Sequence, residues 1–140
     1  MNIVVPNKVQ FDCQRCARCC GDTSHRGRNL LLTNSDVKQI CKVTEMNPLS
    51  FASPISDGGY YQYKMKKRNG KCIFLDGKAC RIYNHRPLIC RFYPFSVEKK
   101  SNKYVFEIAE DCPGIGLGGV IPCEMFEAML QEAQKRLSPI

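Results

Sequence analysis

Residues 11–21 read Phe11-Asp12-Cys13-Gln14-Arg15-Cys16-Ala17-Arg18-Cys19-Cys20-Gly21 and hold four of the ten cysteines in this 140-residue chain. Two-residue gaps separate the first three of these cysteines. Such gaps let three sulfur atoms curl around one centre while backbone N–H groups face them. The stretch therefore predicts a thiolate-ligated metal centre, with the rest of the fold arranged around it.

The neighbouring Cys19 and Cys20 suggest more than one centre. Adjacent side chains point apart in an extended chain, so the pair suits two nearby centres, with one sulfur to each. Four further cysteines complete two sets of four. The predicted metal ligands are Cys13, Cys16, Cys19, Cys20, Cys72, Cys80, Cys90 and Cys112.

The spacing favours iron–sulfur clusters, such as [4Fe–4S], over zinc. Bacterial ferredoxins begin their cluster-binding run with the same C-x2-C-x2-C pattern and place a proline after the remote ligand. Here Pro113 follows Cys112. Zinc remains the alternative, because structural zinc sites also use four thiolates. The segment from Cys72 to Cys90 lacks the second C-x2-C knuckle of a zinc ribbon, however.

The N-terminal residues carry no basic segment followed by an apolar run, and no stretch approaches the roughly 18 apolar residues of a membrane span. These features predict a cytoplasmic protein without a membrane partner. In a reducing compartment, such cysteines more often bind metal than form disulfides. Disulfides are the minor alternative.

The formal net charge of +8 suggests an acidic partner at first sight. Metal-bound cysteines are thiolates. Eight thiolates and two dications would lower the charge by four, to about +4. A nucleic-acid partner is therefore possible but not favoured, and the basic residues 64–68 and 99–100 are interpreted as solvated strand ends.

Local patterns predict an α+β fold over residues 1–140, as a single cysteine-cluster domain. Thr33 and Asp36 form a capping-box pattern before a helix. Asn69-Gly70 and Ser101-Asn102 mark hairpins. The expected return strand covers residues 71–75, and a last helix begins near Pro122. We expect short antiparallel strands, two or three helices, and long loops pinned by metal.

Three arginines, Arg81, Arg86 and Arg91, alternate with the cysteines of this segment. They are candidate cofactor-binding residues that would donate to thiolate sulfur or neutralise an anionic cluster. The alternative, weighed equally, is pairing with surface carboxylates. His25 and His85 are interpreted as surface or turn residues rather than ligands.

Two cysteines are left out of the ligand set. Cys41 lies on the apolar face of the first predicted helix, where a thiol packs as a small hydrophobe. Cys123 lies at a predicted helix start, and packing is favoured over a reactive or ligating role. The Gly-rich residues 114–119 lack the ending of a phosphate-binding P-loop. We interpret them as a loop that lets backbone approach the metal cluster.

The cysteine pattern, Leu32-Thr33-x2-Asp36, residues 70–75, residues 80–95 and residues 112–116 together resemble the CxxCxxCC family of proposed zinc- or iron-chelating domains. The resemblance runs from about Phe11 to Gly119 in the same order. It implies that the eight predicted ligands are the shared set. Flagellin lysine methylases are similar around a comparable cysteine pattern, but they are much longer, and this chain lacks room for the rest of such an enzyme.

Three functions follow from these features. The first is a protein with two closely spaced iron–sulfur centres, used for electron transfer, cluster handling or as the partner of a larger enzyme. The second is a zinc-stabilised module that binds a protein or nucleic acid. The third is a small cluster-dependent enzyme for redox or group-transfer chemistry.

Overall fold

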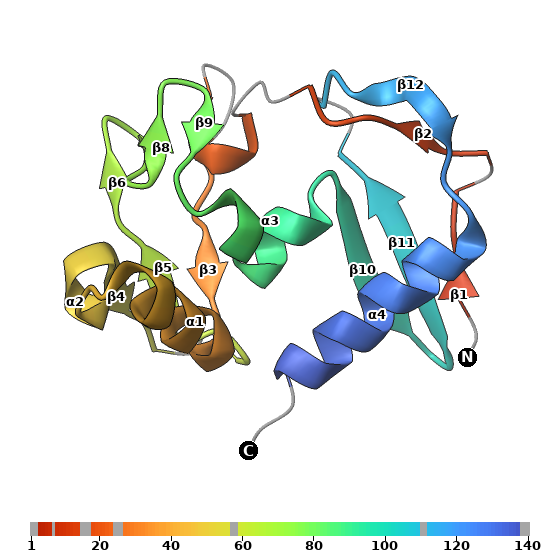
Figure 1. Cartoon of the computed structure of the whole chain (residues 1–140). Helices are drawn as coiled ribbons and strands as arrows, with labels where there is room; N and C mark the ends of the chain where they lie inside the picture. Colours follow the sequence, from red (N-terminus) through yellow and green to blue (C-terminus); the bar gives the residue numbers. More distant parts are fainter. Residues whose placement is uncertain are drawn as a thin grey trace. The chain divides into compact units, whose positions relative to one another are not determined.

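The computed structural model describes residues 3–6, 8–14, 18–23, 27–56, 59–109 and 112–137 (Figure 1). The chain divides into two compact units. Unit 1 comprises Met1–Cys16 and Phe92–Lys135, and unit 2 comprises Ala17–Arg91 and Arg136–Ile140. Both contain helices and short, mostly antiparallel strands, so the α+β class is confirmed. A single domain over residues 1–140 stays a prediction.

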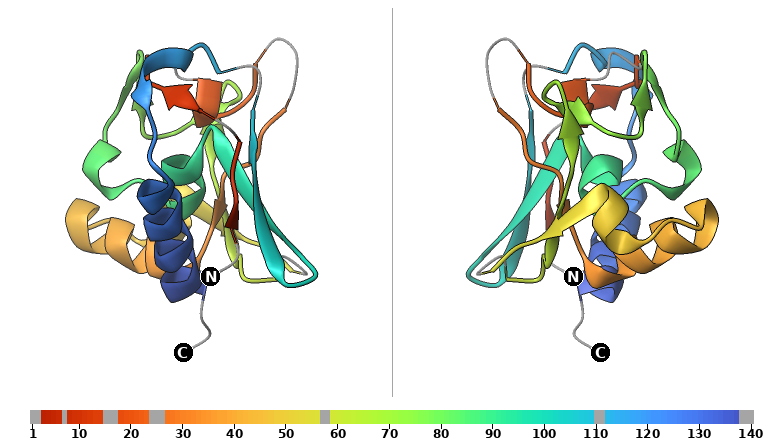
Figure 2. Two further views of the ribbon diagram at one scale, coloured as in Figure 1. Left: turned by 90° about the vertical axis from the view of Figure 1, so that its right-hand side faces the viewer. Right: turned by 90° about the vertical axis from the view of Figure 1, so that its left-hand side faces the viewer.

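Unit 2 contains a three-stranded antiparallel sheet and two helices that share its core. The sheet has the order β3-β5-β4. Its strands are β3 (Leu31–Leu32), β5 (Tyr63–Met65) and β4 (Ala52–Pro54). The helices α1 (Asn34–Thr44) and α2 (Pro48–Phe51) lie side by side in the different views (Figure 2).

The predicted capping box at the start of α1 is confirmed. The Asp36 backbone N–H donates to the Thr33 hydroxyl at 3.0 Å, and the Thr33 N–H donates to the Asp36 carboxylate at 2.9 Å. Val37 and Ile40 are buried, as the helical spacing predicted. They pack with apolar residues of the sheet and with Phe51 from α2, so the helix is held by its apolar face.

Two hairpins continue the chain of unit 2 after the sheet. Their strands are β6 (Lys67–Arg68), β7 (Lys71–Cys72), β8 (Leu75–Asp76) and β9 (Ala79–Cys80). The predicted Asn69-Gly70 turn is confirmed, and both residues have positive φ, 52° and 80°. These angles match the tight turn that Asn-Gly favours in hairpins.

The expected strand over residues 71–75 is wrong, because a turn at Ile73-Phe74 divides it. The Phe74 N–H donates to the Cys72 sulfur at 3.4 Å. The Phe74 side chain is buried, and the centre of its ring lies 5.7 Å from that of Phe51. Burial of this ring in the core favours the turn over a continuous strand.

Of the remaining elements of unit 2, η1 and α3 carry cysteines. The 3-10 helix η1 (Arg18–Cys20) follows the first cysteines, and η2 (Tyr83–His85) precedes α3 (Leu88–Phe92). In Figure 1, η1 is drawn beside the hairpin strands and above α3.

Unit 1 packs two small sheets and one long helix around phenylalanine rings. Its strands are β1 (Ile3–Val4), β2 (Gln10–Phe11), β10 (Phe95–Lys100), β11 (Lys103–Ile108) and β12 (Ile115–Val120). The helix α4 (Cys123–Leu137) begins one residue after Pro122, as predicted. Phe126 lies 5.2 Å from Phe95 and 5.1 Å from Phe106, in edge-to-face contacts.

The Gly-rich segment forms a strand instead of the expected loop at a metal cluster. β12 pairs antiparallel with β2. The Asp12 backbone N–H donates to the Gly114 carbonyl at 3.0 Å. A Cβ added to Gly114 would lie only 2.2 Å from the Asp12 backbone oxygen. This glycine therefore allows close approach of a neighbouring strand.

Among the described residues, no helix combines the length and the apolar character needed to span a bilayer.

Candidate metal centre

The first cysteine loop is attached to the β6–β7 hairpin through Gly21, the residue after Cys19-Cys20. Gly21 forms a backbone bridge with Lys71, and the Asp22 N–H donates to the Gly70 carbonyl at 2.8 Å. A Cβ on Gly21 would lie only 2.4 Å from the Gly70 oxygen. Glycine is thus required for this approach, which brings the cysteine pair to the hairpin that carries Cys72.

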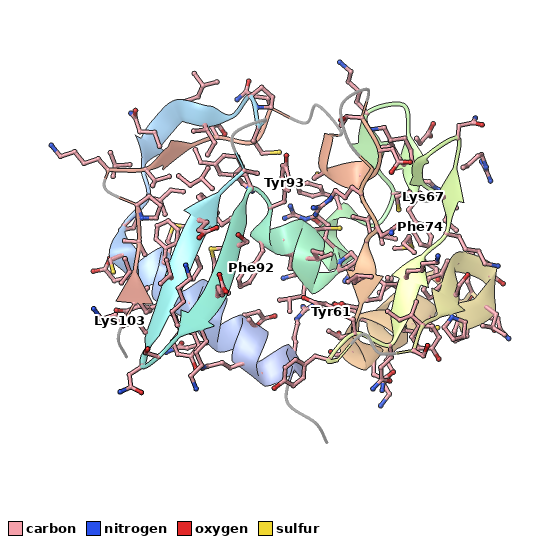
Figure 3. All side chains as sticks on the ribbon, turned by 180° about the vertical axis from the view of Figure 1, so that it is seen from behind. Tyr61, Lys67, Phe74, Phe92, Tyr93 and Lys103 are labelled. Carbon is pink, nitrogen blue, oxygen red and sulfur yellow. The ribbon has the colours of Figure 1, made fainter. Side chains whose placement is uncertain are left out.

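An ion pair strengthens the same attachment. The Lys67 ammonium lies 2.7 Å from the Asp22 carboxylate, which also accepts a hydrogen bond from the Arg28 backbone N–H at 2.8 Å. The Lys67 hydrogen bond lowers the pKa of Asp22 from its ordinary value. Figure 3 shows the side chains of Lys67 and Phe74 in this part of unit 2.

The hairpins place Cys72 and Cys80 at corresponding positions. Cys72 pairs with Lys67 across β6–β7, and Cys80 pairs with Leu75 across β8–β9. Cys72 is buried, with 7% of its surface exposed, and Cys80 is partly buried. Both lie in or against the apolar core of unit 2.

Cys90 is positioned by α3, and α3 is anchored by the buried Asp36. The Asp36 carboxylate accepts hydrogen bonds from the Leu88 N–H at 3.1 Å and from the Arg136 guanidinium at 3.0 Å. Its side chain is fully buried, and these bonds add to those of the capping box. One carboxylate therefore links the start of α1 to the first residue of the helix that carries Cys90.

Five thiols of unit 2 lie within electrostatic reach of one another. The Cys20 thiol donates a hydrogen bond to Cys19, which lowers the pKa of Cys19 and raises that of Cys20. Burial raises the pKa of Cys72 to about 11, and it also raises the pKa of Cys80 and of Cys90. Charges on neighbouring cysteines raise these values further. We call Cys19, Cys20, Cys72, Cys80 and Cys90 the thiol cluster.

Two arginines lie close enough to influence the thiol cluster. The Arg28 guanidinium donates to the Cys19 carbonyl at 3.0 Å. The hydrogen bond from Cys20 is the largest cause of the low pKa of Cys19. The positive charges of Arg28 and Arg86 lower this pKa further. Burial raises the pKa of Cys80, and the Arg86 charge opposes this effect. Positive charge is thus placed where thiolates would form.

The three predicted arginines differ in their surroundings. Arg86 lies 4.0 Å over the Tyr83 ring and near the cluster. The Arg91 guanidinium donates to the carbonyls of Arg86 and Asn84, at 3.1 Å and 3.2 Å. Arg81 is exposed. Contact between these arginines and a cofactor stays a prediction.

The other predicted ligands are not in the described part of unit 2. Cys13 is exposed and Cys112 is partly buried in unit 1, while Cys16 lies outside the described residues. The structure thus groups five of the eight predicted ligands. Among the described residues, no three Cys, His, Asp or Glu side chains are arranged to hold a metal ion.

The residues left out of the ligand set also have definite positions. Cys41 is partly buried against the core of unit 2, as predicted. The prediction that Cys123 packs against other residues is wrong, because this residue is exposed at the start of α4. His85 lies in η2, with its Nδ1 3.1 Å from the Gln39 amide nitrogen. His25 lies outside the described residues.

Sequence reasoning missed Arg28 and the structural roles of Gly21 and Asp36. A glycine directly after Cys-Cys was an available signal for close backbone approach. Asp36 was recognised only as a capping residue, and its bond to Leu88 spans 52 positions in the sequence. No local pattern reports such a contact.

Soft thiolate donors without imidazole or carboxylate suit zinc and iron, and they define a cysteine-cluster metal-binding domain. The chain belongs to the CxxCxxCC family, whose sequence model is described as a "Putative zinc- or iron-chelating domain" and matches residues 12–113. The predicted resemblance is therefore confirmed, and zinc or iron chelation is the function that the family indicates.

Two relatives come from Methanocaldococcus jannaschii. The uncharacterized protein MJ0661 is 32% identical over 131 residues, which cover 86% of this chain and 67% of the relative. The uncharacterized protein MJ0939 is 26% identical over 118 residues, which cover 80% of this chain and 39% of the relative. No solved structure matches the chain.

Proposed function

We propose that the thiol cluster of unit 2 is the principal part of an iron–sulfur site, and that the protein acts in electron transfer or cluster handling. One observation carries this proposal: cysteines from η1, two hairpins and α3 lie in or against the same apolar core. They are Cys20, Cys72, Cys80 and Cys90, and Cys19 is hydrogen-bonded to Cys20. Separate elements thus bring these cysteines to one part of unit 2, where a metal could draw their sulfur atoms together.

The number and chemistry of the donors favour iron–sulfur ligation over one structural zinc ion. A closed structural zinc site uses four ligands. The thiol cluster already holds five, and Cys13, Cys16 and Cys112 are the further predicted ligands. Two centres would use all eight, and the adjacent Cys19 and Cys20 would serve one centre each.

An iron–sulfur cluster would supply one-electron chemistry when bound, with a potential set by burial, charge and hydrogen bonds. The chain's own residues would tune these properties. The apolar core beside Cys72 excludes water, while Arg28 and Arg86 place positive charge near the sulfur atoms. These features support electron transfer more directly than a purely structural role.

A larger protein is the proposed partner. The matched region covers 39% of MJ0939, so this type of domain also occurs joined to additional sequence. An electron-transfer or cluster-handling domain requires such a neighbour, since its cargo must pass to another site.

The first experiment is metal analysis and visible absorption of protein purified without oxygen. We expect a brown sample, broad visible absorption, and matched amounts of iron and acid-labile sulfide. A colourless protein that contains zinc would refute iron–sulfur binding and leave a zinc-stabilised module. A colourless protein without metal would contradict the metal centre itself.

A matched pair of cysteine variants tests the assignment of the cluster. Cys72→Ser should lower bound metal and the melting temperature of the metal-loaded protein, because metal binding contributes folding energy. Cys41→Ala should leave metal stoichiometry unchanged, although both residues contact the same core. Full metal content in Cys72→Ser would remove this residue from the ligand set.

A further inference from the structure

The excess positive charge of the chain is concentrated in one segment. Residues 59–91 hold nine of the 21 lysines and arginines but only one acidic residue, Asp76, while basic and acidic residues balance in the rest of the chain. The nine are Lys64, Lys66, Lys67, Arg68, Lys71, Lys78, Arg81, Arg86 and Arg91. Arg86 influences the thiol cluster, but three of the lysines surround a separate cavity.

This cavity is open to solvent, has a volume of about 300 Å³, and is lined by residues of β4, β5 and β6 together with Asn29. Its lining residues are Asn29, Ser53, Lys64, Met65, Lys66 and Lys67. The lining residues therefore comprise three lysines, an asparagine, a serine and a methionine, and they include no aspartate or glutamate. Small-molecule sites range from roughly 300 to 1,000 Å³, so the cavity is of a size that takes a small ligand.

The sheet register explains how the polar side chains reach one face. Ser53 on β4 pairs directly with Lys64 on β5, so both side chains point to the same side. The next residue, Met65, points the other way and is buried in the core. Lys64 is exposed, and no hydrogen bond or ion pair engages its ammonium group within the described part of the chain.

The ammonium groups of the other two lysines each have one acceptor outside the lining residues. The Lys66 ammonium donates to the Leu49 carbonyl at 2.6 Å, and the Lys67 ammonium pairs with Asp22 at 2.7 Å. An ammonium group has three donors, so each of these lysines retains N–H groups for a ligand. Asp22 balances the charge of Lys67, whereas Leu49 offers Lys66 only a neutral carbonyl, so Lys64 and Lys66 supply the unbalanced positive charge of the lining.

We propose that this cavity binds a small phosphate-bearing molecule. Lysine acts as a point charge toward phosphate, and several ammonium groups suit a ligand with more than one negative charge. Asn29 and Ser53 supply the neutral donors that would fix its orientation. A strand of nucleic acid fits less well, because the lining contains no aromatic side chain on which a base could stack. The site contains no cysteine, and Lys67 is the residue that it shares with the attachment of the first cysteine loop.

The test is calorimetric titration of the full chain with three probes: inorganic phosphate, pyrophosphate and adenosine monophosphate. Sodium chloride at matched ionic strength serves as the reference. We expect saturable binding of at least one probe. Lys64→Gln should weaken it about tenfold, the effect of losing ~1.4 kcal/mol of binding free energy. Asn29→Ala, which keeps the charge, should also weaken it.

Lys78→Gln is the matched control, because it removes the same charge from an exposed lysine outside the cavity. It should change the affinity less than about twofold, on the scale where tenfold is ~1.4 kcal/mol. Equal weakening by Lys64→Gln and Lys78→Gln would overturn the proposal and indicate an adventitious ion only. Absence of saturable binding, or tighter binding of a single-stranded oligonucleotide that Lys78→Gln also weakens, would overturn it as well.

Discussion

Replacing Gly21 with alanine should detach the first cysteine loop from the β6–β7 hairpin. Gly21 has φ near +142°, and an added Cβ would lie 2.4 Å from the Gly70 oxygen and 3.0 Å from the Lys71 Cα. Real Cβ atoms essentially never approach other heavy atoms to less than 3.0 Å. The backbone of either the loop or the hairpin must therefore move.

The expected loss of stability has two sources. A side chain at such a φ angle costs about 1–3 kcal/mol. The overlap with backbone atoms adds about 1–3 kcal/mol, as overpacking does elsewhere. The sum of roughly 2–6 kcal/mol is large beside the usual total of about 5–15 kcal/mol. Because Cys19 and Cys20 directly precede Gly21, metal affinity should fall with stability.

Gly77→Ala is the matched control. Gly77 also has positive φ, +63°, but no atom lies within 4 Å of its added Cβ. This variant should lose only the conformational part, about 1–2 kcal/mol. Denaturant unfolding of metal-free protein would give both free energies, and competition with a chelator would give metal affinity. Hydrogen exchange of the Asp22 amide reports the attachment directly, since it donates to Gly70.

If Gly21→Ala unfolds with the same free energy as Gly77→Ala and keeps its metal in the competition, the attachment described above is wrong. The same conclusion follows if exchange of the Asp22 amide is unchanged. Loss of stability with unchanged metal affinity would contradict the link between this contact and the thiol cluster.

Two further predictions concern the side chains that hold the cluster in place. Thr33→Ala should destabilise the protein by about 1 kcal/mol through loss of the N-cap. Asp36→Ala should cost about 3–5 kcal/mol, because it removes a fully buried carboxylate that bonds to Thr33, Leu88 and Arg136. Equal values in denaturant unfolding would contradict the added role of Asp36. The ion pair between Asp22 and Lys67 should make the free energy of unfolding depend on pH. Its stabilising contribution is complete above the ordinary Asp22 pKa of 3.8, and it is lost as the pH falls through the lower pKa that Asp22 has in the folded protein. Lys67→Met should shift the Asp22 carboxyl titration, measured by NMR, back toward 3.8, and an unchanged titration would argue against the pair.

Local sequence patterns predicted the elements that depend on local interactions. The capping box at Thr33, the Asn69-Gly70 turn and the start of α4 near Pro122 are each determined within a few residues. The hairpin at Ser101-Asn102 is of the same kind. Such features need no knowledge of distant neighbours, and this is why they could be predicted.

Pairing between distant segments could not be predicted in this way. Ile3 pairs with Tyr104 in a parallel arrangement across about a hundred residues. The Gly-rich segment becomes β12 because Gly114 lies against Asp12, again about a hundred positions away. Strand glycines are unfavourable in isolation, so only the partner strand explains them.

The same distinction between local and distant interactions applies to the candidate site. The cysteine spacing predicted the ligand set, but it did not show that Cys19, Cys20, Cys72, Cys80 and Cys90 gather in one unit. That grouping depends on two contacts between separate elements: Gly21 with Lys71, and Leu88 with Asp36. Both involve backbone atoms of residues that carry no metal-binding chemistry.

These contacts also explain why gathered thiols and metal binding belong together. The scaffold brings these cysteines to one part of unit 2 through bonds that require no metal. Burial then raises the pKa of Cys72 and of Cys90, and nearby thiolate charges raise it further. Without a cation the cluster is therefore most stable with these thiols protonated. Ligation requires thiolates, so metal binding must displace those protons, and the affinity of the cluster for metal should rise with pH.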